Sequence, residues 1–270
     1  MSAPDDFKLA RWTFAAQNRL MSDNPTAAVL VIGNEILSGR TQDTNSNAIA
    51  RFLAPLGITL CEIRVVGDDA STIISALNAL RAQVDYVFTT GGIGPTHDDI
   101  TADAVATAFG VGIEYHPEAL ALLAARYADP ADFNEMRRRM ARIPDGASLV
   151  KNPVSAAPGF QLGNVFVLAG VPSIMRAMLE DVAPRLKRGR PVLALTIAAS
   201  VAEGAIAGAL KEIQERWPSV AIGSYPFYRD DGYGVQLVVR GIEPEVVEAV
   251  ASAISMMLEK AGGMPQRFSP

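Results

Sequence analysis

The feature that most limits the fold of this chain is a glycine-rich turn within residues 89–101, whose sequence is TTGGIGPTHDDIT. We call residues 91–99 the glycine turn. A short apolar segment, residues 86–88, precedes it, and residues 102–109 follow with apolar side chains at helical spacing. A strand, a glycine loop and a helix in this order bring free backbone N–H groups and the positive end of a helix dipole together. Both favour a bound anion such as phosphate.

The glycine turn also carries two adjacent carboxylates, Asp98 and Asp99. They stand where the anion would lie, so they would repel it unless a cation stood between them. This combination indicates a phosphate-and-metal site. The alternative is an ordinary turn between a strand and a helix, in which Asp99 only caps the helix.

Strand and helix patterns alternate through the first third of the chain. Residues 27–32 are a continuous apolar run, which is typical of a strand buried on both faces of a parallel sheet. Further strands are predicted at 59–66 and 84–88, and helices at 46–53 and 71–82. This alternation predicts an α/β fold with a mostly parallel sheet and helices on both sides.

Three of the predicted strands are followed by acidic turns. Glu35 follows the first strand, Asp68 and Asp69 follow the second, and Asp98 and Asp99 follow the third. Ligands bind beyond the carboxyl ends of the strands in such sheets, so these acids should share one sheet edge. The sequence therefore predicts a metal-assisted phosphate site at that edge.

The segment between 111 and 150 reads as predominantly helical, and a second region rich in glycine and proline follows at 152–160. We expect helices at 117–128, 133–142 and 174–182, and a strand at 164–168.

The C-terminal part predicts a small α+β unit of β-α-β-β-α order, after a linker at 184–191. We expect its elements at 195–201, 206–217, 220–225, 233–240 and 244–260. It carries no glycine-rich phosphate loop, which suggests roles in packing, in oligomer contacts or in covering the first site. The predicted domains are therefore an N-terminal extension at 1–24, an α/β domain at 25–186 and the small domain at 192–262.

Composition excludes several classes of protein. With a formal net charge of −5, the protein lacks the positive charge that attracts the phosphate backbone, so nucleic acid is not an expected partner. Cys61, the only cysteine, cannot form an internal disulfide and is expected to be buried within an apolar run. No run approaches the roughly 18 apolar residues of a membrane helix, so we expect no membrane contact and a cytoplasmic protein.

Six short motifs in order give the chain a family resemblance. They are IGNEILSG at 32–39, VGDD at 66–69, the segment 89–101, NP at 152–153, APGF at 157–160 and GVPS at 170–173. Over residues 27–182 the chain resembles the molybdopterin-binding fold superfamily. It is most similar to the N-terminal part of CinA-type competence/damage-inducible proteins and to the related domain fused to eukaryotic FAD synthases.

The resemblance implies a three-layer α/β/α domain that binds a phosphate-bearing nucleotide or pterin. In pterin-handling relatives the ligand is molybdopterin, which is adenylylated with Mg²⁺. In CinA-type relatives the domain is associated with cleavage of nucleotide pyrophosphates such as ADP-ribose. It also implies Mg²⁺ or another divalent cation as cofactor, and we expect a homo-oligomer.

The resemblance also points to individual residues of this chain. Asp99, Asp69 and Asp68 are the expected catalytic residues, and Glu35, Asp69, Asp98 and Asp99 are the expected metal ligands. The expected ligand-binding residues are Gly33, Asn34, Glu35, Ser38, Gly39, Asn45, Thr90, Gly91, Gly92, Gly94, Pro95, Thr96, Thr101, Asn152, Pro158, Gly159, Gly170, Pro172 and Ser173.

The chain departs from the CinA pattern at several positions. Asn34 stands where those chains usually carry Asp, and Ala169 and Ile174 stand where Pro and Glu are common. Loss of two acids would weaken metal binding. Three functions therefore stay open: a Mg²⁺-dependent nucleotide pyrophosphatase, a molybdopterin-binding or adenylylating protein, and a non-catalytic nucleotide-binding module.

Overall fold

The computed structural model describes residues 24–229 and 232–268. The chain divides into two compact units, with the boundary between Gly189 and Arg190. The first unit is Pro25–Gly189, and the second contains the residues from Arg190 onward. The predicted N-terminal extension, 1–24, lies outside the described residues except for Asn24.

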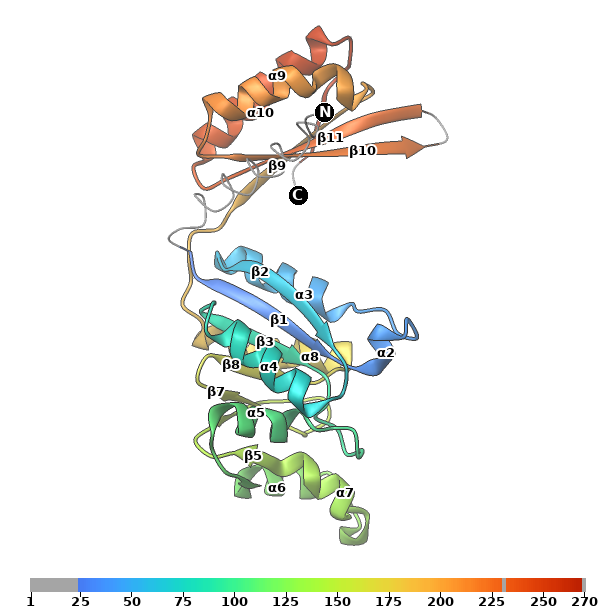
Figure 1. Cartoon of the computed structure of the whole chain (residues 1–270), viewed down its shortest axis with the longest axis vertical. Coiled ribbons are helices and arrows are strands. Elements are labelled where there is room, and N and C mark those ends of the chain that lie inside the picture. Colours follow the sequence, from blue (N-terminus) through green and yellow to red (C-terminus); the bar gives the residue numbers. More distant parts are fainter. Residues whose placement is uncertain (1–23, 230–231, 269–270) are drawn as a thin grey trace, which may run out of the picture. The chain divides into compact units, whose positions relative to one another are not determined.

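The first unit is built on a six-stranded sheet of order β2-β1-β3-β8-β7-β6 (Figure 1). Its strands are β1 (Thr26–Ile32), β2 (Thr59–Val66), β3 (Tyr86–Thr90), β6 (Ser148–Val150), β7 (Gly159–Leu162) and β8 (Val165–Leu168). The four strands β2, β1, β3 and β8 are parallel, whereas β7 and β6 are antiparallel additions at one edge. The predicted mostly parallel sheet is confirmed.

Helices cover both faces of this sheet. The side chains of β1 point alternately to the two faces and so belong to two separate cores. Ala28, Leu30 and Ile32 pack with helices α4 (Ala70–Arg81) and α5 (Thr101–Phe109). Ala27, Val29 and Val31 pack on the other face with α3 (Asn45–Leu53) and α8 (Pro172–Val182). Each fully buried aliphatic side chain stabilises the fold by about 1.5–3 kcal/mol. The three-layer α/β/α prediction is confirmed.

The shorter elements connect these layers. The short helices are α2 (Asn34–Leu37), α6 (Pro117–Ala124) and α7 (Glu135–Arg138), and the 3-10 turns are Ala54–Leu56, Pro130–Asp132, Arg139–Ala141 and Ala183–Arg185. Two short strands, β4 (Ile113–Tyr115) and β5 (Arg142–Pro144), pair with each other.

The prediction of a predominantly helical 111–150 segment is wrong in part. The helix expected at 117–128 ends at Ala124, and that expected at 133–142 shrinks to α7 and a 3-10 turn. Asp129 precedes Pro130, which disfavours helical backbone, and Asp129 is extended (φ −100°, ψ 121°). Pro144 similarly favours the extended backbone of β5.

The expectation that Cys61 is buried is also wrong, because this side chain is exposed. It lies on β2, which forms one edge of the sheet. The pairing of β2 with β1 passes from Leu60 to Glu62 and skips Cys61, so Cys61 is the extra residue of a β-bulge.

The carboxyl ends of the parallel strands lie at one sheet edge, as expected. Ile32 is the register partner of Val66, and Val31 is that of Thr90. Thr90 in turn pairs with Leu168. The four turns that follow these strands are therefore neighbours.

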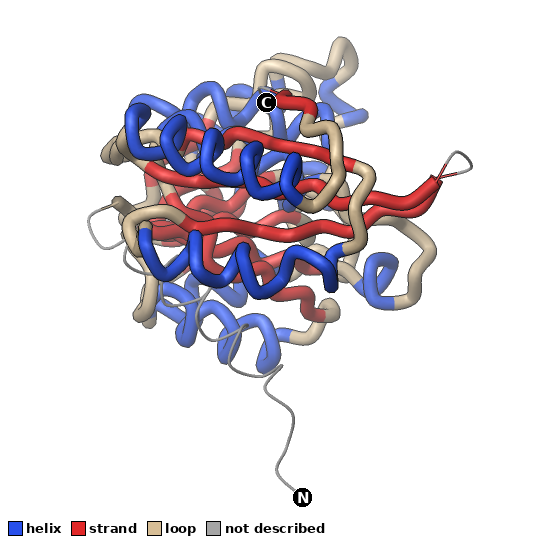
Figure 2. The backbone as a smooth tube through the Cα atoms, turned by 90° about the horizontal axis from the view of Figure 1, so that it is seen from above, coloured by secondary structure: helices blue, strands red, loops and turns tan. Residues whose placement is uncertain are grey.

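The second unit contains a four-stranded antiparallel sheet of order β10-β11-β9-β12. Its elements are β9 (Leu193–Ala199), α9 (Glu203–Arg216), β10 (Ala221–Arg229), β11 (Gly232–Gly241), α10 (Pro244–Lys260) and β12 (Gln266–Phe268). The two helices lie side by side on one face of the sheet, and the β10–β11 hairpin extends beyond them (Figure 2). The predicted β-α-β-β-α order is present, and β12 is an additional strand beyond the predicted end at 262.

The longest helix that the structure describes, α10, has 17 residues. At 1.5 Å per residue it spans about 25 Å, less than the roughly 30 Å core of a bilayer. Within the described ranges, no helix is long and apolar enough to cross a membrane.

Candidate functional site

The glycine turn requires glycine at its first position. Gly91 has a φ of +102°, and a Cβ atom built on it would lie 2.1 Å from the backbone oxygen of Ile32. A Cβ on Gly170 would lie 3.2 Å from the Cα of Gly91. The turn after β3 therefore packs directly against the backbone at the end of β1 and against the turn after β8.

Thr101 holds the glycine turn in place from the start of α5. Its hydroxyl donates to the backbone oxygen of Gly91 at 2.9 Å, and its N–H donates to that of Gly92 at 3.0 Å. The Thr101 side chain is fully buried. This predicted ligand residue therefore supports the turn from the interior of the protein.

Asp98 and Asp99 meet at the exposed tip of the turn, around Thr96. The Thr96 hydroxyl oxygen lies 2.5 Å from a carboxylate oxygen of each aspartate, and the Thr96 N–H donates to Asp99 at 2.8 Å. A hydroxyl has one hydrogen to donate, so it can satisfy only one of the two carboxylates. The Thr96 hydroxyl holds the pKa of Asp98 below its usual value, so that carboxylate is charged at neutral pH.

A first hollow lies at the edge where the turns after β1, β3 and β8 meet, and we call it the asparagine hollow. The predicted residues that line it are Glu35, Asn45, Thr90, Gly91, Gly170 and Pro172. It brings together predicted residues from four separate segments of the chain.

Asn45 is buried in the wall of the asparagine hollow, with 7% of its surface exposed. Its amide nitrogen donates to the backbone oxygen of Gly170 at 2.7 Å, which fixes the orientation of the amide. Its amide oxygen, Oδ1, has no hydrogen-bond partner among the described residues.

The segment 41–44 also lines this hollow, although none of its residues was among the predicted site residues. Within it, Asp43 accepts hydrogen bonds from the N–H groups of Asn45 and Ser46, at 2.9 and 3.1 Å. These bonds fix the start of α3 and so position Asn45. An aspartate placed two residues before a helix is the signal that could have identified this segment.

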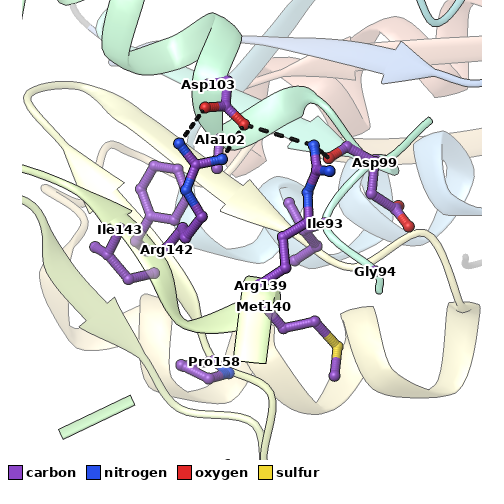
Figure 3. A pocket seen from close by; sticks show the side chains of 12 residues that line it. Ile93, Gly94, Asp99, Ala102, Asp103, Arg139, Met140, Arg142, Ile143 and Pro158 are labelled. Atoms are coloured by element: carbon purple, nitrogen blue, oxygen red, sulfur yellow. Dashed lines mark hydrogen bonds and ion pairs between the residues drawn. The ribbon is translucent and has the colours of Figure 1, made fainter. Parts of the chain in front are cut away.

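A second hollow lies on the other side of the glycine turn, and we call it the arginine hollow (Figure 3). Four of the predicted ligand or metal residues line it, namely Gly92, Gly94, Asp99 and Pro158. Three further lining residues were not among the predicted site residues: Asp103, Arg139 and Arg142. In the sequence, the arginine run at 137–139 could either reach an anionic ligand or form a solvated helix face, and the second interpretation is the favoured one. The structure instead turns Arg139 into the hollow.

The acidic turn after β2 has structural roles in this structure. Asp68 accepts the N–H of Asn34 at 2.8 Å and so joins two neighbouring turns. Asp69 caps α4 and accepts from the Thr72 N–H at 2.8 Å and from the hydroxyls of Ser71 and Thr72. These bonds, the Ser71 hydroxyl first, lower the Asp69 pKa from 3.8 to about 2.

Replacing Asp69 by Ala should make the protein less stable by an amount that depends on pH. Because the folded-state pKa of Asp69 is lowered, its stabilising effect is full above the unfolded pKa and is lost as the pH falls through about 2. We therefore expect the difference in urea midpoint between wild type and Asp69→Ala to be constant at neutral pH and to shrink between pH 4 and pH 2. A difference that grows on acidification would contradict the helix-cap role.

The remaining predicted residues line neither hollow. Asn152 is buried and bonds within its own turn, to Ser155 and to the backbone oxygen of Ala157. Gly159 permits close approach of β7 and β8, because a Cβ there would lie 2.2 Å from the Val167 backbone oxygen. The others are placed in the turns around the hollows: Gly33, Asn34, Ser38 and Gly39 after β1, Pro95 and Thr96 in the glycine turn, and Ser173 in the first turn of α8.

Within residues 24–229 and 232–268, no three His, Cys, Asp or Glu side chains form a group that could hold a metal ion. The single centre of Glu35, Asp69, Asp98 and Asp99 expected from the sequence is therefore absent as a group. These side chains have separate local roles: Asp69 caps α4, and Glu35 lines the asparagine hollow. Of the four, only Asp98 and Asp99 lie next to each other, on either side of the Thr96 hydroxyl.

A family model described as a probable molybdopterin binding domain matches residues 28–188, which is more than half of the chain. The chain belongs to this family. Its second unit matches a model described as the middle domain of FAD synthase, over residues 191–266. The two matches meet at the boundary between the structural units.

Relatives of this molybdopterin-binding-domain protein include a curated protein from Aeropyrum pernix. It is 36% identical over 219 residues, which cover 76% of this chain and 81% of that protein. A protein from Pyrobaculum arsenaticum is 38% identical over 210 residues, covering 74% and 79%. The solved structure of a CinA protein of unknown function from Thermoplasma acidophilum is 36% identical, with a TM-score of 0.57, and covers 60% of this chain and 98% of that one.

Proposed function

We propose that this protein binds a phosphate-bearing nucleotide or pterin at the glycine turn, with the base or pterin group in the asparagine hollow. The observation that carries the proposal is the unpaired Oδ1 atom of buried Asn45. A buried polar atom without a partner costs about 1–3 kcal/mol, and such an atom calls for a functional explanation. Nucleobases, riboses and pterins all offer the N–H or O–H groups that would satisfy it.

The turn itself suits the phosphate part of such a ligand. Gly91 and Gly92 both have positive φ, which is typical of loops whose N–H groups converge on an anion. The following helix, α5, begins at Thr101 and adds a positive dipole end. These features support phosphate binding at the turn that the sequence also indicated.

We further propose that the ligand is a nucleotide pyrophosphate, such as ADP-ribose, and that it is hydrolysed with Mg²⁺. Asp98 and Asp99 fit this ion, because carboxylate oxygens are its preferred ligands and the Thr96 hydroxyl leaves one of the two carboxylates unsatisfied. With two protein ligands, the ion would also use waters and ligand phosphates. When bound, it would supply Lewis-acid chemistry at the phosphoryl group, while the N–H groups of the turn would stabilise the negative charge that develops there.

Asn45→Ala should weaken the binding of ADP-ribose about tenfold, since one hydrogen bond to a buried acceptor is lost. Isothermal titration calorimetry in the presence of Mg²⁺ measures this change. The matched control is Asn47→Ala, because Asn47 lies two residues further along α3 and is exposed. We expect the control to bind like wild type. Equal affinity of wild type and a folded Asn45→Ala protein would contradict the placement of the ligand in this hollow.

The description of the matching family favours molybdopterin as a second candidate ligand. The asparagine hollow would serve a pterin ring in the same way, because the ring carries amide and amino N–H groups. Tight binding of molybdopterin together with failure to bind ADP-ribose would select this alternative.

A further inference from the structure

The two arginines of the arginine hollow take no part in the binding described above, although this hollow shares the glycine turn with the asparagine hollow and contains Asp99. Gly91 lines the asparagine hollow and Gly92, the next residue, lines the arginine hollow. Consecutive Cα atoms are about 3.8 Å apart. A ligand whose phosphates rest on the turn therefore lies beside residues that line both hollows.

The two arginines of this hollow differ in how they are paired. Arg142 forms a two-pronged ion pair with Asp103, with distances of 2.7 Å from Nη2 to Oδ1 and 2.9 Å from Nη1 to Oδ2. Such a fork-to-carboxylate pair neutralises both charges. The charges of Arg142 and Asp103 therefore offset each other on the wall of the hollow.

Arg139 has only long contacts in the same place. Its Nη2 atom lies 3.9 Å from Oδ2 of Asp103 and 3.5 Å from the backbone oxygen of Asp99. A guanidinium carries five N–H donors, so these two contacts leave most of its donors for a ligand. About 29% of the side chain is exposed, which places the charge at the mouth of the hollow and not in the core.

The acidic groups beside Arg139 do not oppose an anion there strongly. Asp103 is neutralised by Arg142, and the Asp99 carboxylate accepts the Thr96 N–H at 2.8 Å. In Figure 3 the Asp99 side chain extends away from the two arginines. Arg139 is therefore the cation of the hollow without a close carboxylate partner among the described residues, and the Asp99 carboxylate is the anion that the proposed Mg²⁺ ion would offset.

We propose that Arg139 binds the second phosphate of the ligand and so makes the site selective for diphosphates over monophosphates. This inference rests on the proposed function of the glycine turn. A guanidinium suits the role because its planar fork matches two oxygens of one phosphate. A purely structural Arg139, which only tied the segment after α7 to α5, would affect stability but not the choice between the two ligand classes.

The test compares Arg139→Gln with Arg138→Gln, in the full chain with Mg²⁺. Arg138 is the matched control, because its guanidinium lies over the ring of Tyr115, 5.9 Å from the ring centre, and does not line the hollow. Calorimetric titrations with ADP-ribose and with AMP give the affinity for two phosphates and for one. Arg139→Lys, which keeps the charge but loses the fork, is the third variant.

For Arg139→Gln we expect ADP-ribose binding to weaken about tenfold to a hundredfold, and AMP binding to change less than about twofold. Arg138→Gln should match wild type for both ligands, and Arg139→Lys should weaken ADP-ribose binding by an intermediate factor. Equal affinities of wild type and Arg139→Gln, or an equal loss for both ligands, would overturn the inference and leave the proposed function intact. Wild-type protein that binds neither ligand would overturn the proposed function and this inference together. If Arg139→Gln does not fold, Arg139→Lys makes the same comparison.

Discussion

Asp99→Asn should lower the rate of Mg²⁺-dependent ADP-ribose hydrolysis at least about a hundredfold, while ADP-ribose still binds. The asparagine amide has the size of the carboxylate and keeps an oxygen to accept the Thr96 N–H, which donates to Asp99 at 2.8 Å. The variant therefore retains the turn but loses the negative charge that would hold the metal ion. Release of AMP, followed by chromatography, measures the rate.

The control for this prediction is Asp69→Asn. Asp69 belongs to the other acidic turn that the sequence marked as catalytic, but the structure uses it as the cap of α4. Asparagine caps helices about as well as aspartate, so stability and hydrolysis should both stay close to wild type. An Asp99→Asn protein that hydrolyses ADP-ribose at the wild-type rate would rule out the catalytic role, as would an Asp69→Asn protein that loses as much activity.

Gly91→Ala should destabilise the protein by at least about 3 kcal/mol, because two costs combine. The residue has a φ of +102°, which L-residues rarely adopt, and the new Cβ would lie 2.1 Å from the Ile32 backbone oxygen. Backbone atoms of a central buried strand cannot move aside cheaply. Urea denaturation measures the difference in free energy of unfolding.

Gly110→Ala separates these two costs. Gly110 has a φ of +68° at the end of α5, but a Cβ there would have no atom within 4 Å. Only the conformational cost remains, and we expect a loss of about 1 kcal/mol. Similar losses at the two positions would contradict the close packing of the glycine turn against β1.

The parallel sheet and its ligand-binding edge could be predicted from the sequence because short-range patterns determine them. The apolar run of β1 indicates burial on both faces, and its side chains indeed divide between two cores. The glycines of the turn are similarly local signals, since their backbone conformation excludes other residues. The regular βαβ order then places the turns after β1, β2 and β3 side by side.

The features that the sequence did not reveal depend on contacts between distant segments. Arg139 reaches the hollow because α7, a 3-10 turn that begins at Arg139 and the start of β5 replace the continuous helix expected at 133–142. Its neighbour Asp103 is 36 positions earlier in the chain, so no spacing pattern links the two. Likewise, the exposure of Cys61 results from a bulge on an edge strand, and an apolar run does not distinguish an edge from a centre.

The acidic turns show why a shared sheet edge is not enough to define a metal site. The sequence correctly placed Glu35, Asp69 and Asp99 after neighbouring strands. Side-chain direction, however, depends on local hydrogen bonds such as those that make Asp69 a helix cap. Only Asp98 and Asp99 adjoin, and the proposed Mg²⁺ site is correspondingly reduced to these two residues.

The most direct test of ligand binding at the glycine turn is calorimetric titration of the wild-type chain with ADP-ribose, with and without Mg²⁺. We predict saturable binding at one site per chain that is tighter with Mg²⁺ and is lost stepwise in Asn45→Ala and Arg139→Gln. The same titration with FAD, NAD, ATP and molybdopterin ranks the other ligands. Absence of binding for all five compounds, with Mg²⁺ present or absent, would contradict the proposal that this edge of the sheet is a nucleotide or pterin site.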